Sequence, residues 1–61
     1  MTIRHHDLIE IAGDVEGETK LAYRFFDGDR HVWLPKSQCE WDPIAHIMTM
    51  PEWLAVEKEL V

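Results

Sequence analysis

The chain has 61 residues, twelve of them acidic and six basic, so its formal net charge is −6 at pH 7. This length predicts a single domain over residues 1–61 with a thin core. The charge argues against binding to nucleic acid or anionic membranes and favours a basic partner, although a charge of this size is also ordinary for a small domain that stays in solution.

The composition narrows the class of protein further. Hydrophobic residues make up 46% of the chain and include three Trp, which argues against disorder. A lone cysteine, Cys39, excludes an internal disulfide and favours a reducing compartment. The first twenty residues lack the apolar run of a signal peptide, and no stretch is long enough to span a bilayer. We therefore expect a cytoplasmic protein, with residues 1–6 flexible.

The N-terminal half shows the alternation of apolar and polar residues that is typical of strands. In residues 7–12, Ile9 and Ile11 share one face. Gly13 permits a bend, and residues 14–18 are predicted to be irregular strand or turn. Residues 19–26 give the clearest strand signal, with Leu21, Tyr23 and Phe25 on one face.

A hairpin and a second strand pair should follow. Asp27-Gly28 between alternating runs is a strong hairpin signal, and the return strand over residues 30–34 should end at Pro35. Residues 36–38 allow one tight helical turn. Residues 39–41 and 44–48 look extended, with Asp42-Pro43 as the turn between them.

The C-terminal segment predicts a helix. Thr49 and Glu52 have the spacing of a capping box, with Pro51 in the first turn. Trp53, Val56 and Leu60, widened by Leu54 and Val61, would form the apolar stripe that packs on the sheet. The predicted fold is therefore α+β: a small antiparallel sheet of four or five strands, curled or closed into an SH3-like partial barrel, packed by one C-terminal helix.

Metal binding and catalysis find no support in the spacing of the reactive side chains. The histidines and the single thiol, His5, His6, His31, His46 and Cys39, match no familiar zinc pattern. No nucleophile or acid pair has a catalytic context, and so short a chain has little material for a deep pocket. We predict no metal, no cofactor and no enzymatic activity.

The acidic side chains are the remaining candidates for a functional surface. Residues 7–18 contain five acidic residues and no basic one. If residues 14–18 are extended, Asp14, Glu16 and Glu18 lie on one face about 6.8 Å apart. The predicted partner-binding residues are Glu10, Asp14, Glu16, Glu18, Asp27, Asp29, Glu40 and Asp42.

Such a surface could imitate DNA. A 20 Å length of duplex carries roughly twelve charges, which equals the number of carboxylates here. The six basic residues dilute that charge, so a one-sided acidic patch is a better prediction than full mimicry of a helix.

The tryptophans offer an alternative function. In a domain of this size a tryptophan more often belongs to the core than to a ligand platform. Trp33 nevertheless lies opposite Val32 and Leu34 on its strand and could remain outside the core. Exposed Trp33, Trp41 or Trp53 would then support a structural or oligomerising module, and the chain could be a monomer or a homodimer.

Two tryptophan–proline segments carry a family resemblance. The segment Val-Trp-Leu-Pro-Lys-Ser-Gln at residues 32–38 and the segment Met-Pro-Glu-Trp-Leu-Ala at residues 50–55 resemble small uncharacterised proteins of phages and mobile elements. The resemblance covers roughly residues 18–61 and transfers no functional residue. This chain ends in Glu-Lys-Glu-Leu-Val, where many relatives have a glycine before the final apolar pair.

Small acidic phage proteins include inhibitors of bacterial defence, among them anti-CRISPR proteins. By this analogy of size, charge and origin, the resemblance implies a non-enzymatic inhibitor in the host cytoplasm. Its partner would be a basic, nucleic-acid-binding surface of a host complex. Neutralising Asp14, Glu16 and Glu18 should then slow association and weaken its salt dependence.

Overall fold

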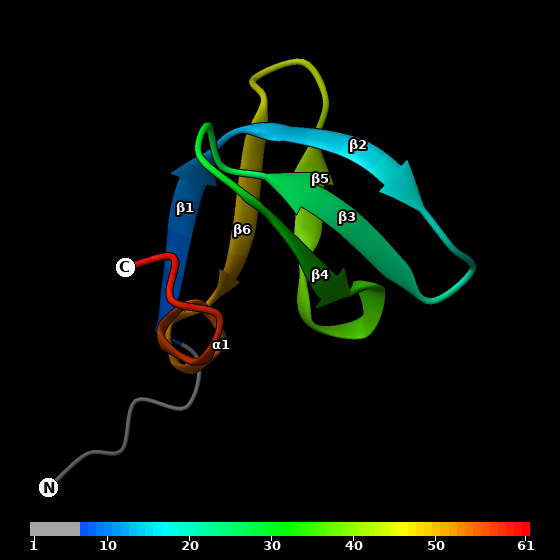
Figure 1. The fold of residues 1–61 in the computed structure, drawn as a ribbon. Helices are drawn as coiled ribbons and strands as arrows, with labels where there is room; N and C mark the ends of the chain where they lie inside the picture. The colour runs from blue at the N-terminus through cyan, green and yellow to red at the C-terminus, as the bar shows by residue number, and fades with distance from the viewer. Residues whose placement is uncertain (1–6) are drawn as a thin grey trace, which may run out of the picture.

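A computed structural model describes residues 7–61, and the segment 1–6 that was predicted to be flexible lies outside the described residues. The described elements follow in the order β1 (Leu8–Ala12), β2 (Asp14–Glu18), β3 (Ala22–Phe26), β4 (His31–Pro35), the 3-10 turn η1 (Lys36–Gln38), β5 (Glu40–Asp42), β6 (Ile47–Pro51) and α1 (Glu52–Glu57) (Figure 1). The predicted α+β class, with antiparallel strands and a C-terminal helix, is confirmed.

The strands of the described chain form two antiparallel sheets of three strands each. Sheet A has the order β1-β6-β5, and sheet B has the order β2-β3-β4. A single sheet of four or five strands is therefore not confirmed. The difference arises at the bend between β1 and β2, where the chain leaves sheet A and enters sheet B (Figure 1).

Gly13 makes this bend. Its N–H donates to the carbonyl oxygen of His46 at 3.0 Å. A Cβ atom at this position would lie 2.6 Å from a ring carbon of Phe25 and would overlap the carbonyl oxygen of Phe26. The alternation of exposed and inward residues nevertheless runs through the bend without a break. Strands β1 and β2 thus present one continuous exposed row of even-numbered residues.

The β3–β4 hairpin is confirmed, and the side chain of Asp27 closes its turn. Oδ1 of Asp27 accepts hydrogen bonds from the backbone N–H groups of Asp29 at 2.8 Å and Arg30 at 2.9 Å. Both bonds hold the pKa of the Asp27 carboxyl below its usual value, and the bond from the Arg30 N–H has the larger effect. Gly28 takes a φ of +101°, which a glycine adopts without strain.

The β5–β6 connection is longer than predicted. Oδ1 of Asp42 accepts from the N–H groups of Ile44 and Ala45 at 3.0 and 3.1 Å, which draws these residues into a turn. The turn extends to His46 at a φ of +57°, so β6 begins at Ile47 and not at residue 44. Ile44 is consequently 92% exposed.

The predicted capping box is wrong. Thr49 lies within β6, and α1 follows Pro51, whose extended backbone caps the helix without a side-chain hydrogen bond. The N–H of Glu52 instead donates to the carbonyl oxygen of Asp7 at 2.9 Å. Strand pairing held residues 47–51 extended because β6 is the central strand of sheet A and bonds to both neighbours.

The predicted apolar stripe is wrong at Trp53, Val56 and Val61, which are exposed, whereas Leu54 is in the core and Leu60 packs against it. Leu54 and Ala55 face the core, whereas Trp53 is 51% and Val56 57% exposed. β6 ends at Pro51 and α1 begins at Glu52, so no linker separates the strand from the helix.

The core lies between the two sheets and under the helix. Its buried side chains are those of Phe25, Leu34, Cys39, Met48, Met50, Leu54 and Ala55. Trp41 packs against this core, with its ring at 70° to that of Phe25 and the centroids 6.3 Å apart. The expectation of core tryptophans therefore holds only for Trp41, which is itself partly buried, because Trp33 is 49% exposed and Trp53 is half exposed. Within residues 7–61, no helix has both the length and the apolar character needed to cross a membrane.

Candidate functional site

The structure divides the eight predicted acidic residues among three places. Asp14, Glu16 and Glu18 form the exposed row of β2, as the alternation predicts. Glu10 on β1 and Glu40 on β5 lie on the outer face of sheet A. The other three belong to turns or to the end of a strand: Asp27, Asp29 and Asp42.

Every carboxylate of the β2 row has a basic neighbour from another part of the fold. Asp14 Oδ1 lies 2.6 Å from His46 Nδ1, in the β5–β6 turn. Glu16 Oε1 lies 2.6 Å from His31 Nε2 on β4, and Glu18 Oε2 accepts from Lys36 Nζ on η1 at 2.6 Å. Lys36 therefore offsets the charge of Glu18, and a histidine ring contacts each of the other two carboxylates.

These basic neighbours are themselves held in place. The ring of His31 stacks on Phe26 with centroids 4.7 Å apart. The ring of His46 meets Trp41 edge-on at 6.2 Å, and Lys36 Nζ lies over the ring of Tyr23 at 5.1 Å. A ligand cation that approached the β2 row would therefore meet carboxylates that already have a contact within the fold.

The carboxylates on sheet A have a different environment. In the strand register, Glu10 is opposite Thr49 on one side of β6, and Glu40 is opposite Thr49 on the other. Two strand spacings, about 9.6 Å, separate the two backbones. Within the described part of the chain, neither Glu10 nor Glu40 takes part in an ion pair.

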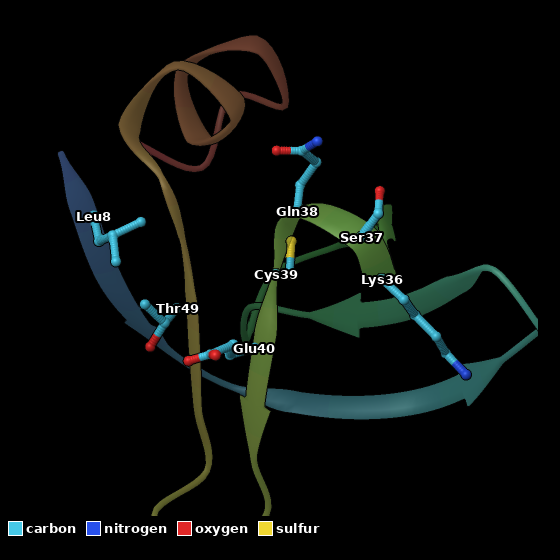
Figure 2. Close-up of a pocket in the computed structure, with 7 residues that line it drawn as sticks. All are labelled: Leu8, Lys36, Ser37, Gln38, Cys39, Glu40 and Thr49. Carbon is cyan, nitrogen blue, oxygen red and sulfur yellow. The ribbon is translucent and has the colours of Figure 1, made fainter. Parts of the chain in front are cut away.

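A hollow of about 400 Å³ opens beside Glu40 (Figure 2). Its lining comes from sheet A and from the segment that links β4 to β5: Leu8, Lys36, Ser37, Gln38, Cys39, Glu40 and Thr49. Figure 2 shows Glu40 and Thr49 close together on neighbouring strands, whereas the Lys36 side chain extends away from them. Its volume lies in the lower part of the range for small-ligand sites.

The lining determines which ligand chemistry the hollow can accept. Glu40 supplies a negative charge, Thr49 and Gln38 supply hydrogen-bonding groups, and Leu8 supplies an exposed apolar surface. This combination suits an aliphatic side chain that ends in a cation, such as lysine or arginine. Lys36 does not cancel the charge of Glu40 because its Nζ is bound to Glu18.

Cys39 does not make the hollow reactive. Burial raises the pKa of its thiol to about 11. The thiol is therefore neutral at physiological pH, and only thiolates are effective nucleophiles. Cys39 acts as a small apolar core residue.

Sequence reasoning missed several residues of this surface. It considered His31 and His46 only as metal ligands, whereas each lies against a different carboxylate of β2. Residues 7–61 contain no group of three side chains that could hold a metal ion. Thr49 was assigned to a helix cap, although it lies between Glu10 and Glu40. These pairings depend on strand order, which alternation along one strand does not reveal.

Comparisons with protein-family models, with curated proteins and with solved structures find no match for this chain. The candidate site is therefore defined by its own geometry. That geometry is an exposed pair of carboxylates, Glu10 and Glu40, flanking Thr49 beside a hollow.

Proposed function

We propose that this protein is a non-enzymatic binding protein whose acidic face docks on a basic surface of a partner protein. The observation that carries the proposal is the pair Glu10 and Glu40, which are exposed and without ion pairs in the described structure, beside the hollow of sheet A. A lysine or arginine of the partner enters the hollow and pairs with Glu40, while Glu10 attracts a second cation.

The β2 row and the Glu10 and Glu40 pair on sheet A differ in the contacts that a partner cation would have to compete with. On β2, each carboxylate already has a partner within the fold, Lys36 on Glu18 and a histidine ring on Asp14 and on Glu16, so a partner cation competes with an existing contact. On sheet A, a partner cation adds a pair where none exists. The gain in affinity is therefore greater at Glu10 and Glu40 than at Asp14, Glu16 and Glu18, which contribute mainly to long-range attraction.

A stable interface needs more surface than the hollow provides. A standard interface covers about 800 Å² per partner, which is close to a fifth of the 4394 Å² that this molecule exposes. The continuous exposed row of β1 and β2 runs from Glu10 to Glu18, so it supplies the extension that an interface of this size requires.

The identity of the partner class rests on the resemblance to phage and mobile-element proteins and on the net charge of −6. We propose an inhibitor of a host defence complex that binds nucleic acid, similar in strategy to anti-CRISPR proteins and located in the host cytoplasm. By covering basic residues that would otherwise bind DNA or RNA, the inhibitor acts stoichiometrically. The two three-stranded sheets, joined at the bend of Gly13, would give it a rigid platform.

Affinity capture from the natural host with three baits tests this proposal. The wild type should retain one predominant partner with a basic surface, and E10Q/E40Q should retain much less of it. The variant D14N/E16Q/E18Q removes one more charge but should retain more partner than E10Q/E40Q does. Equal recovery with the wild type and E10Q/E40Q would contradict the assignment of the site.

A structural or oligomerising module remains the second candidate, because Trp33 and Trp53 are each about half exposed. Light scattering after size-exclusion chromatography at several salt concentrations separates the two candidates. A dimer that is insensitive to salt and is lost on replacing a tryptophan with alanine supports the module. A monomer of 7.2 kDa supports the acidic binding protein.

A further inference from the structure

A second surface, on α1, is independent of the acidic face of sheet A. At about 100° per residue, positions 52, 53, 56 and 57 fall within one arc of about 140°. All four of these residues are exposed, whereas Leu54 and Ala55 on the opposite side are buried. We name the exposed arc the helix strip, consisting of Glu52, Trp53, Val56 and Glu57.

The helix strip combines a large apolar surface with negative charge. Trp53 and Val56 are neighbours at the i, i+3 spacing, about 5–6 Å apart, and are 51% and 57% exposed. Glu52 is adjacent to Val56 and Glu57 to Trp53 at the i, i+4 spacing. Neither glutamate takes part in an ion pair within the described chain.

The fold holds this short helix firmly at both ends. The N–H of Glu52 donates to the carbonyl oxygen of Asp7 at 2.9 Å. At the other end, Nη2 of Arg30 donates to the carbonyl oxygens of Lys58 and Glu59 at 2.5 and 3.0 Å. A six-residue helix is unstable alone, so these contacts and the burial of Leu54 and Ala55 keep the strip in a fixed shape before any ligand binds.

Trp33 provides a useful contrast, because it is exposed to nearly the same degree. Trp33 lies opposite Arg24 in the β3–β4 register, so its flank has a long cationic side chain on the same face. In the helix strip, the residues that flank Val56 and Trp53 are Glu52 and Glu57, which are acidic. Exposure of a tryptophan therefore does not distinguish the two sites, but the surrounding charge does.

We infer that the helix strip binds an amphipathic segment of a partner protein, in which two or three apolar residues are flanked by lysine or arginine. The apolar residues cover Trp53 and Val56, and the flanking cations pair with Glu52 and Glu57. Charge disfavours a symmetric contact between two copies of this chain, because two helix strips facing one another would bring four glutamates together without a cation among them.

The area of the helix strip sets the scale of the interaction. Half of a tryptophan surface is about 120 Å², well below the roughly 800 Å² of a standard interface. The strip is therefore one anchor in a larger contact, and an isolated peptide should bind it weakly and exchange rapidly. Nuclear magnetic resonance suits this regime, because each tryptophan indole N–H gives its own signal.

The test uses a synthetic amphipathic peptide of about 14 leucine and lysine residues, titrated into the ¹⁵N-labelled full chain. The indole signal of Trp53 and the amide signals of residues 52–57 should shift, while the indole signal of Trp33 should not. W53A and V56A should each weaken binding at least tenfold, and W33A should leave it unchanged. E52Q/E57Q should weaken binding and reduce its dependence on salt.

Two controls make the test decisive. A peptide with serine in place of each leucine should not shift the Trp53 signal, and W33A, whose replaced tryptophan is equally exposed but lies outside the helix strip, should give the same Trp53-region shifts as the wild type. Equal shifts of Trp33 and Trp53, or full affinity in W53A, would overturn the inference. Self-association of the free chain that W53A abolishes would also overturn it, by assigning the strip to a second copy.

Discussion

At the scale of single residues, Gly13 has the largest structural consequence. It lies where the chain leaves one sheet for the other, and the backbone of Phe26 and the ring of Phe25 occupy the space that a side chain would need. Both obstacles belong to packed elements and cannot simply rotate away.

Gly13→Ala should therefore destabilise the fold, by about 1–3 kcal/mol as expected for overpacking. Gly17→Ala is the matched control, because its new Cβ would lie an ordinary 3.5 Å from the Cβ of Arg24. The control should change stability by less than about 1 kcal/mol. Urea denaturation of both variants measures the difference, and equal losses of stability would show that Gly13 is not the hinge between the sheets.

Cys39 gives a second prediction at this scale. Burial raises the pKa of its thiol from 9.0 to about 11, so the thiolate fraction in the folded chain is about 100-fold lower at any pH below both values. Iodoacetamide should modify Cys39 slowly in the native protein at pH 8 and rapidly in urea. Fast labelling of the native protein would show that the thiol is not buried.

The raised pKa of the Cys39 thiol also determines how the stability of the fold changes with pH. The folded pKa lies above the unfolded one, so the protonated thiol favours the folded state below pH 9. This contribution is lost as the pH rises from 9 towards about 11. Cys39→Ala should flatten the loss of stability over that range, as followed by urea midpoints at increasing pH.

At the scale of elements, β2 is tied to the rest of the fold by its three carboxylate pairs. Exposed ion pairs each contribute about 0.2–1 kcal/mol and weaken in salt. D14N/E16Q/E18Q should therefore lower stability modestly at low salt and hardly at all at high salt. E10Q/D29N/E40Q removes the same number of charges, and because Glu10 and Glu40 have no such pair it should not destabilise the fold. Equal losses in both variants would show that the pairs do not hold β2.

The sequence predicted those parts of the fold that depend on local pattern. The hairpin at Asp27-Gly28 and the exposed row of β2 are confirmed, because two-residue alternation and turn chemistry act within a few positions. The helix cap was wrong because strand pairing extends β6 through Thr49, and the helix face was wrong at Trp53 and Val56, which are exposed. Such pairing joins residues far apart in the chain.

The candidate site was also only partly predictable, because alternation acts locally whereas strand pairing joins distant residues. Alternation correctly placed Glu16 in an exposed row, and Glu10 and Glu40 are exposed as well. It could not show that Glu16 meets His31 or that Glu10 and Glu40 flank Thr49. These relations follow from the order of strands in the two sheets.

At the scale of the whole molecule, a net charge of −6 is distributed over two kinds of surface. The β2 row is already paired within the fold, whereas the outer face of sheet A is not. The helix strip adds an apolar surface with acidic flanks. Under the proposed function, this arrangement would attract a basic protein at long range through the total charge and hold it through a few unpaired groups.

The most direct test is the kinetics of binding to the host partner recovered by affinity capture, followed across a series of salt concentrations. Association of the wild type should slow steeply as salt increases, and E10Q/E40Q should dissociate faster and lose affinity at least tenfold. D14N/E16Q/E18Q should mainly slow association. If E10Q/E40Q binds with wild-type affinity and the same salt dependence, the acidic face of sheet A is not the working surface of this protein.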